Sequence, residues 1–207
     1  MPTDPPHLVI VLGTRNRKKG EELLDHLTGL PVTLRTLAEF PQAPEVIEDG
    51  ATFIDNARKK ATELARALES WVLGEDSGLA VDALGGRPGV YSARYSGAGA
   101  TDESNNQKLL DELANVPDGE RTAHYVCTAA LADPAGRIRA EVEGRCHGQI
   151  ARSPRGNAGF GYDPLFVIPE YHRSFAELDL IVKRHLSHRA RAMSRLRREF
   201  WRVIAGP

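Results

Sequence analysis

The chain has 207 residues, of which 27% are charged and 41% are hydrophobic, and its formal net charge is −1. This length is enough to bury a sizeable core, and the balanced charge gives no indication of general nucleic-acid binding, which requires a surplus of lysine and arginine. Residues 1–14 lack a basic segment and contain only a short apolar run, so we expect neither a secretory signal nor a membrane span, and we expect a cytoplasmic protein.

Predicted strands and helices alternate in the first half of the chain. The continuous apolar run 8–12 predicts a strand that is buried on both faces. Apolar residues at helical spacing predict helices over about 19–27 and 52–69. Further predicted elements are a strand over 31–37, a loop over 41–44 and a short buried strand over 71–73.

The second half changes character. A capped amphipathic helix is predicted over 101–113, followed by alternating apolar residues over 122–133, the turn sequence DPAG and a returning strand over 137–149. A loop rich in glycine and proline over 153–161, a strand over 164–169 and a helix over about 187–204 complete the chain. Cys127 and Cys146 have no C-x-x-C spacing, and we expect them to be reduced. These elements predict a single α/β domain over 1–207 with a mixed sheet and a long antiparallel hairpin.

Two adjacent acids follow the third predicted strand, within the segment GEDSGLAVDALGGRPGVYSARYS. Glu75 and Asp76 are expected where a strand of an open α/β sheet meets its ligand crevice. Their carboxylates suit Mg²⁺, which is held by one or two carboxylates, water and substrate phosphate oxygens. Glu48 lies in the loop before a predicted helix and could be a third acid of this site. Taken alone, the sequence EDSG favours a capped turn, and Glu48 taken alone is more simply an acid that interacts with a helix dipole.

The loop GTRNRKK joins the first predicted strand to the first predicted helix. Backbone N–H groups at a helix N-terminus, polar side chains and a lysine together suit a phosphate chain. The loop does not match the G-x-x-x-x-G-K-[ST] pattern of a Walker loop, and by itself it is also typical of a solvated surface turn. Lys60, on the second predicted helix, could join Lys19 in neutralising phosphate oxygens, although a lysine in a helix is more often only part of a solvated face.

Two aromatic rings and a carboxylate stand in the segment GFGYDP, at Phe160, Tyr162 and Asp163. Such a group could stack on a flat base and accept hydrogen bonds from its edge. An aromatic turn that belongs to the core explains the same residues equally well.

Polar and basic residues gather where the last helix is expected to begin, and we place Lys183, His185, His188 and Arg189 there. A zinc site is not expected, because no cysteine or third histidine is nearby in the sequence, and hydrogen-bond donation to a carbonyl oxygen is the better use. The arginines that follow are expected to form a solvated face over an apolar stripe rather than a nucleic-acid contact.

These segments, in this order, resemble the inosine/xanthosine triphosphate pyrophosphatase family, which removes non-standard purine nucleotides from the nucleotide pool. The matching pieces are GTRNRKK, EDGATFIDNARKKA, GEDSGLAVDALGGRPGVYSARYSG, GFGYDPLF and the stretch from SFAEL to KRHLSHRARA, and they extend over about residues 8–195. The resemblance implies an elongated mixed α/β fold with two lobes around a central cleft, a homodimer, dependence on Mg²⁺, and hydrolysis of ITP, dITP or XTP to the monophosphate and pyrophosphate.

The resemblance also implies roles for individual residues. Asp76 would be the base that activates water, and Glu48, Glu75 and Asp76 the acidic metal site. The remaining positions would bind the substrate: Thr14, Arg15, Asn16, Arg17, Lys18, Lys19, Lys60 and Ser77 at the triphosphate, and Phe160, Gly161, Tyr162, Asp163, Lys183, His188 and Arg189 at the base and its surroundings.

Two other readings stay open. The chain could be a pyrophosphatase for modified pyrimidine or other aberrant nucleotides that shares the acidic site but not the base pocket. Alternatively, it could be a nucleic-acid-binding module that uses its arginine-rich last helix, a reading that the near-neutral net charge argues against.

Overall fold

The computed structural model describes residues 8–205, and within them the strands form one mixed sheet of order β2-β1-β3-β4-β5-β6-β7. Strand β1 (Leu8–Leu12) pairs in parallel with β2 (Val32–Thr36) and β3 (Trp71–Val81). At the other end of the order, β6 (Phe166–Ile168) pairs antiparallel with β5 (Ile138–Ile150) and β7 (Arg173–Ser174). The predicted α/β class with a mixed sheet is confirmed.

The chain divides into two compact units. Among the described residues, unit 1 consists of 8–76, 128–144 and 192–205, and unit 2 of 77–127 and 145–191. Strands β3, β4 (Thr122–Ala132) and β5 contribute residues to both units. Each unit has its own buried apolar cluster.

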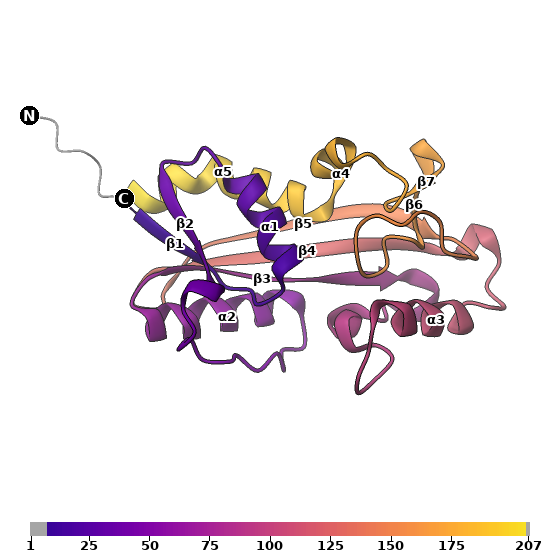
Figure 1. Ribbon diagram of the computed structural model, residues 1–207, viewed down its shortest axis with the longest axis horizontal. Coiled ribbons are helices and arrows are strands. Elements are labelled where there is room, and N and C mark those ends of the chain that lie inside the picture. The colour runs from indigo at the N-terminus through magenta and orange to yellow at the C-terminus, as the bar shows by residue number, and fades with distance from the viewer. Residues whose placement is uncertain (1–7, 206–207) are drawn as a thin grey trace, which may run out of the picture. The chain divides into compact units, whose positions relative to one another are not determined.

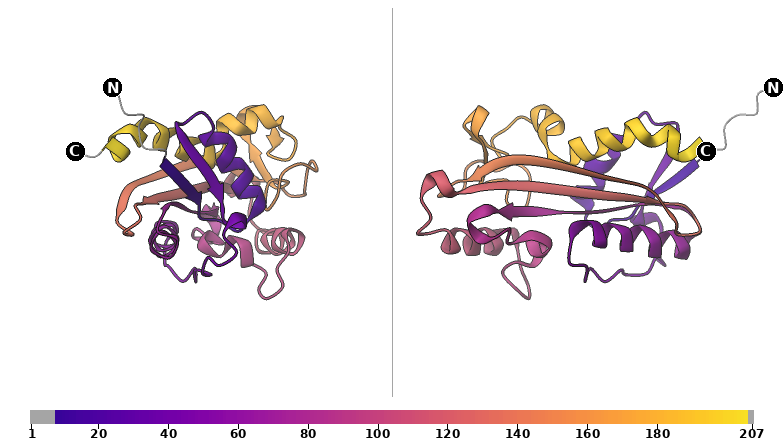
Figure 2. Two further views of the ribbon diagram at one scale, coloured as in Figure 1. Left: turned by 60° about the vertical axis from the view of Figure 1, so that its left-hand side comes forward. Right: turned by 180° about the vertical axis from the view of Figure 1, so that it is seen from behind.

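Unit 1 places helices on both faces of its strands, with α2 (Phe53–Leu68) on one face and α1 (Arg17–Leu27) on the other (Figures 1 and 2). The side chain of Thr52 caps α2 by accepting a hydrogen bond from the backbone N–H of Asp55. Small buried residues of α2, including Ala57, Ala61 and Ala65, pack with Val11 and Val72 of the sheet. Small side chains let this helix lie close to the strands.

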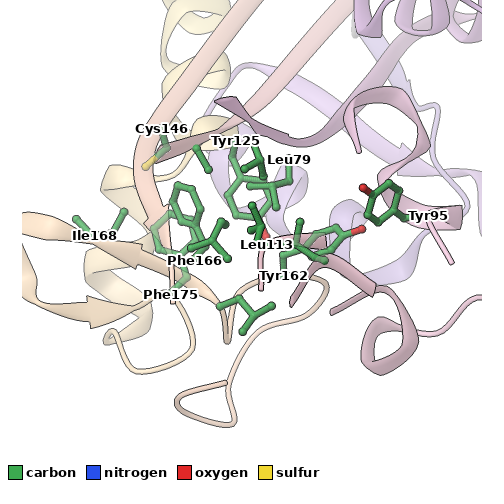
Figure 3. Packing of buried hydrophobic residues seen from close by; sticks show 14 of the residues in the cluster. Leu79, Tyr95, Leu113, Tyr125, Cys146, Tyr162, Phe166, Ile168 and Phe175 are labelled. Atoms are coloured by element: carbon green, nitrogen blue, oxygen red, sulfur yellow. The ribbon is translucent and has the colours of Figure 1, made fainter. Parts of the chain in front are cut away.

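Unit 2 is built around an aromatic cluster, in which Tyr125, Phe166 and Phe175 gather beside Leu79 (Figure 3). The ring centroids of Phe166 and Phe175 are 5.0 Å apart and the rings are tilted by 60°, an arrangement that favours aromatic pairs. Helix α3 (Asp102–Glu112) contributes Leu109 to this cluster. A reciprocal capping box between Thr101 and Ser104 begins the helix, as its Thr-Asp-Glu start predicts.

Two expectations about element boundaries are corrected, and two short elements were not predicted. Helix α1 begins at Arg17 rather than Lys19, because Asn16 caps it and accepts from the backbone N–H of Lys19. The helix expected over about 187–204 is confirmed as α5 (His188–Ala205), whereas the short helix before it, α4 (Leu180–Leu186), was not predicted. Strand β3 continues to Val81 instead of ending at Leu73, and the short β7 has no counterpart in the sequence prediction.

No helix within residues 8–205 is long and apolar enough to cross a membrane. Cys127 and Cys146 are both buried, and no disulfide bond joins them. Burial raises the pKa of Cys146 to about 11, so this thiol stays protonated and unreactive at neutral pH.

Candidate active site

Glu75 and Asp76 lie in the interior of β3, not at its end as the sequence predicts. The reason is that β3 extends further along the chain than β1, its parallel neighbour. The pairing of β1 with β3 ends at Leu12 and Leu73, and the backbone N–H of Gly13 donates to the Leu73 carbonyl at 2.8 Å. The two acids therefore stand just beyond the carboxyl end of β1. Open α/β sheets bind ligands at the carboxyl ends of their strands, and the two acids have this position relative to β1, although β3 itself continues to Val81.

Gly74 allows α2 to approach β3 immediately beside these acids. A Cβ atom at this position would lie 2.3 Å from the carbonyl oxygen of Ala57 and 2.6 Å from the nitrogen of Ala61. Both distances are too short for any side chain. The glycine thus sets the spacing at which Lys60, on α2, can reach the acids of β3.

The Lys60 ammonium group is the centre of a charged cluster in unit 1. Its Nζ lies 2.9 Å from Oε2 of Glu48 and 3.5 Å from Oδ1 of Asp76, and it donates to the backbone carbonyl of Glu75 at 3.0 Å. A second ammonium group, that of Lys19, lies 3.4 Å from Oε2 of Glu75. The structure therefore brings together the three acids and two lysines that the sequence proposes for this site.

Burial governs the protonation of this cluster. It raises the pKa of the Asp76 carboxyl, against the opposing effects of Lys60, Lys19 and a hydrogen bond from Asn56. Burial also works to lower the pKa of Lys60, but the carboxylates of Asp76 and Glu48 outweigh it and raise this pKa. Lys60 therefore keeps its charge, and Asp76 is a stronger base than an exposed aspartate.

Asn56 orients the Asp76 carboxylate. Its Nδ2 donates to Oδ2 of Asp76 at 3.0 Å, and its own Oδ1 accepts from the backbone N–H of Gly50 at 2.8 Å. On the other side, the hydroxyl of Thr128 donates to the backbone carbonyl of Asp76 at 3.3 Å. The sequence assigns no role to Asn56 or Thr128, although Asn56 precedes Lys60 by four residues on one helix and so shares its face. Thr128 gives no local signal, because it comes from β4.

The donor set of this cluster fits a divalent cation. Within residues 8–205, no three His, Cys, Asp or Glu side chains form a group that could hold a metal ion without other ligands. Mg²⁺ does not require such a group, because it uses one or two carboxylates and takes its other ligands from water and phosphate oxygens. Glu75 and Asp76 are buried carboxylates, and that of Glu48 is partly exposed.

Some side chains of the segment 14–19 cap α1 or face the acids, and others bond elsewhere or are exposed to solvent. Asn16 caps the helix, Thr14 Oγ1 accepts from the backbone N–H of Asn16, and Lys19 faces Glu75. Arg15 instead donates to the backbone carbonyl of Ala43 at 2.7 Å. The side chain of Arg17 is 90% exposed and pairs with Glu21 of the same helix, and Lys18 is exposed. An ion pair joins Lys19 of this segment to Glu75, one of the acids of the site.

A second cluster, in unit 2, is organised by Asp163. Its Oδ2 accepts from the backbone N–H of Phe160 at 3.0 Å and lies 2.7 Å from Nζ of Lys183. The ammonium group of Lys183 also lies 5.1 Å from the centre of the Phe160 ring, close enough for a cation–π contact. Burial and the neighbouring Asp163 raise the pKa of Tyr125 well above its usual value, so its hydroxyl remains a donor 3.5 Å from Oδ1 of Asp163.

Residues at the start of α5 extend this second cluster. The ring of His188 stacks on Tyr125, with centroids 4.7 Å apart and planes 10° from parallel. Arg189 is almost completely buried and its Nη2 donates to Oγ of Ser77 at 3.0 Å. Ser77 directly follows Asp76 along β3. Tyr125 was missed by the sequence analysis, because its partners come from other elements.

One expectation about the last helices is corrected, and Tyr162 of the loop 159–163 lies in the core. Lys183 and His185 belong to α4, not to the start of the last helix, and His185 is exposed, with Nδ1 2.8 Å from the carbonyl oxygen of Ile181. Tyr162 is 4% exposed, packs in the unit 2 core and donates its hydroxyl to the backbone carbonyl of Ser92 at 2.9 Å. This position agrees with the alternative prediction for the segment GFGYDP, in which the Tyr162 ring is part of the core.

The arginines of α5 are largely engaged within the protein. Arg197 donates to the carbonyls of His26 and Thr28 at 3.1 and 2.9 Å, at the C-terminal end of α1, and Arg195 donates to the carbonyl of Glu143. Arg191 donates to the carbonyl of Leu186 at 3.1 Å. These contacts argue against the reading in which this helix is a nucleic-acid-binding surface.

An α/β sheet with a buried acid–lysine cluster beyond the end of a parallel strand has the position of a ligand site and the charges that phosphate chemistry uses. Comparison with known proteins is more specific. Residues 10–199 match the model of the Ham1 family. A dITP/XTP pyrophosphatase of Rhodopirellula baltica is 57% identical over 184 residues, which are 89% of this chain and 88% of that protein. A dITP/XTP pyrophosphatase of Geobacter sulfurreducens is 53% identical over 188 residues, which are 91% of this chain and 94% of that protein.

The structural comparison agrees with the sequence comparison. A HAM1 protein from Coxiella burnetii superposes with a TM-score of 0.84 at 39% identity, covering 91% of this chain and 96% of that one. The chain belongs to the Ham1 family.

Proposed function

We propose that the protein hydrolyses the non-standard purine nucleoside triphosphates ITP, dITP and XTP to the nucleoside monophosphate and pyrophosphate, and thereby keeps these nucleotides out of DNA and RNA. The observation that carries this proposal is the 57% and 53% identity to two dITP/XTP pyrophosphatases over about nine tenths of the chain. The acid–lysine cluster of unit 1 supplies the chemistry that such a reaction requires.

Asp76 acts as the general base in this proposal. The oxygen of a water molecule bonds to a phosphorus atom of the α–β phosphoanhydride, and Asp76 takes a proton from this water. The bond from that phosphorus to the bridging oxygen breaks, and the products are the nucleoside monophosphate and pyrophosphate. Asn56 holds the carboxylate from the side of α2, so that one oxygen is fixed while the other faces Lys60. Burial supports the assignment, because it makes Asp76 more basic than an exposed aspartate.

Charge neutralisation is the main work of the remaining unit 1 residues. Phosphoryl transfer is catalysed chiefly by positioning and electrostatic stabilisation. Mg²⁺, held by carboxylates of Glu48, Glu75 and Asp76, would supply positive charge at the phosphate oxygens when bound. Lys19 and Lys60, now paired with these acids, provide further positive charge, and the residues assigned to the triphosphate are completed by Thr14, Arg15, Asn16, Arg17, Lys18 and Ser77.

Base recognition falls to unit 2. The Phe160 ring offers a stacking surface, and Asp163, Lys183, His188 and Arg189 provide polar groups next to it. Hypoxanthine and xanthine carry an oxygen at the purine 6-position, which accepts hydrogen bonds, whereas adenine carries an amino group. Donors such as Arg189 therefore favour the 6-oxo bases, and a site built around such a bond can discriminate about 10⁴-fold, because the wrong base leaves buried groups unpaired.

We propose that the two units serve one nucleotide as a single pyrophosphatase domain over 1–207, that the protein is a homodimer, and that it acts in the cytoplasm, where it meets the nucleotide pool. The covalent link supports joint action of the units, because Asp76 and Ser77 are consecutive residues of β3.

The deciding experiment measures pyrophosphate and orthophosphate released from ITP, XTP, GTP and ATP, with Mg²⁺ and with EDTA. The proposal predicts metal-dependent pyrophosphate from ITP and XTP and little from ATP. Guanine shares the 6-oxygen, so little pyrophosphate from GTP would show that the purine 2-position is also selected. Hydrolysis of modified UTP or CTP in place of ITP would instead favour the alternative that the protein is a pyrophosphatase for modified pyrimidine nucleotides. Release of orthophosphate alone, or no turnover, would overturn the proposed reaction.

A further inference from the structure

Two side chains of α3 form hydrogen bonds with the backbone of Gly161, at the centre of residues 159–163, which we call the base-recognition loop. The carboxylate of Asp102 accepts a hydrogen bond from the backbone N–H of Gly161 at 2.7 Å, and Nδ2 of Asn106 donates to the Gly161 carbonyl oxygen at 3.0 Å. Asp102 and Asn106 are four residues apart on one helix and therefore lie on the same face, one turn apart.

The two bonds hold the peptide groups on either side of the Gly161 Cα atom. The N–H belongs to the peptide that Gly161 shares with Phe160, and the carbonyl to the peptide that it shares with Tyr162. Gly161 has a φ of +61°, in the left-handed region, and glycine is the residue with the greatest backbone freedom. Anchoring both peptide groups removes that freedom, so the two α3 side chains determine how Phe160 is presented relative to Asp163.

The state of Asn106 supports a specific role. The residue is 9% exposed, and within the described residues its Oδ1 is buried without a hydrogen-bond partner. An unsatisfied buried carbonyl is unfavourable for folding, and an apolar side chain of similar size avoids this penalty. The hydrogen bond from Nδ2 to the Gly161 carbonyl oxygen therefore gives a reason for an asparagine, rather than an apolar residue, at position 106.

We infer that Asp102 and Asn106 are positioning residues for purine recognition, and that they act by holding the Gly161 backbone so that Phe160 can stack on the base. This inference rests on the proposed function. Neither side chain is required to touch the nucleotide or the reacting phosphates.

The test compares Asp102→Ala, Asp102→Asn and Asn106→Leu with wild type. Asp102→Ala removes the acceptor, whereas Asp102→Asn retains a side-chain carbonyl that can accept from the Gly161 N–H. Asn106→Leu removes the donor and the unsatisfied carbonyl while keeping the number and branching of the side-chain heavy atoms. Gln107→Ala is the matched control, because Gln107 is exposed on the same helix and its amide bonds only to Asp111 of that helix.

We expect the KM for ITP to rise about five- to tenfold in Asp102→Ala and Asn106→Leu, the effect of losing one hydrogen bond, while kcat changes less than about twofold. Asp102→Asn should restore most of the affinity. The inhibition constant of inorganic tripolyphosphate, which has no base, should not change in any variant. Asn106→Leu should melt no lower than wild type, so that loss of affinity is separated from loss of stability.

Amide hydrogen exchange over residues 159–163 supplies a readout that does not depend on turnover. Exchange should be faster in Asp102→Ala and Asn106→Leu than in wild type and Gln107→Ala. Unchanged exchange would show that α3 does not hold the loop, and faster exchange with an unchanged KM would show that the loop does not position the base; either result overturns the inference. Failure of wild type to release pyrophosphate from ITP would refute the proposed function and with it the link to purine recognition, and exchange would then report only whether the backbone anchor exists.

Discussion

Nδ2 of Asn56 donates a hydrogen bond to Oδ2 of Asp76 at 3.0 Å, in the interior of unit 1. Asn56 comes from α2 and Asp76 from β3, and the same asparagine also accepts from the Gly50 backbone. One amide thus ties the loop that follows Glu48 and Asp49 to the carboxylate proposed as the base. This hydrogen bond brings together two residues of the candidate site that are 20 positions apart in the sequence.

Replacing Asn56 with alanine should lower kcat for ITP about tenfold, because the Asp76 carboxylate loses its orienting donor, while KM changes little. Steady-state pyrophosphate release is the measurement. Glu63→Ala, an exposed change on the same helix, is the control and should retain wild-type activity. A larger effect on KM than on kcat would indicate that Asn56 serves substrate binding instead.

Asp76→Asn should bind ITP but lose turnover by at least about 10²-fold, the usual contribution of a positioned general base. The amide keeps the size of the carboxylate and cannot take a proton from water. Titration calorimetry with ITP would measure binding, and pyrophosphate release would measure turnover. If turnover were unchanged, Asp76 would have no place in the mechanism.

Gly74→Ala should lower the free energy of unfolding by about 2–3 kcal/mol, because its Cβ would overlap the Ala57 carbonyl at 2.3 Å and separate α2 from β3. Lys60 would then also move from Asp76, so activity should fall with stability. Urea denaturation checks the first effect. Gly119→Ala is the matched control, since no atom lies within 4 Å of its added Cβ, and its stability should stay near that of wild type.

Asp133 should make stability depend on pH. The residue is 3% exposed; burial works to raise its pKa, but hydrogen bonds from the Arg137 backbone and side chain and from Arg139 outweigh burial and lower the pKa below its usual value. A carboxyl with a depressed folded-state pKa stabilises the protein above the unfolded-state pKa of about 3.9, and this stabilisation is lost as the pH falls through the folded-state value.

Asp133→Asn should therefore be less stable than wild type by about 1–3 kcal/mol at pH 7, and the difference should narrow as the pH falls below about 4. Urea denaturation at pH 7, 5 and 3.5 would measure it. A difference that stays constant over this range would show that ionisation of Asp133 contributes nothing to stability.

Sequence patterns located the regular elements well where local physics determines them. The apolar run of β1 and the Thr101 cap of α3 act through neighbouring residues, and both predicted elements were confirmed. The length of β3 was not predictable in this way, because Glu75 and Asp76 interrupt the apolar run and only pairing with neighbouring strands keeps them in an extended conformation.

The sequence by itself determined the family, the α/β class and the residue types of the candidate site, because motif spacing and hydrophobic periodicity are properties of the chain. Only the tertiary structure decided that α2 carries Lys60 and Asn56 to the acids of β3, and that α3 holds Gly161. Hydrogen bonds and ion pairs of this kind join residues far apart in sequence. They depend on the close approach of packed elements, which no local pattern records.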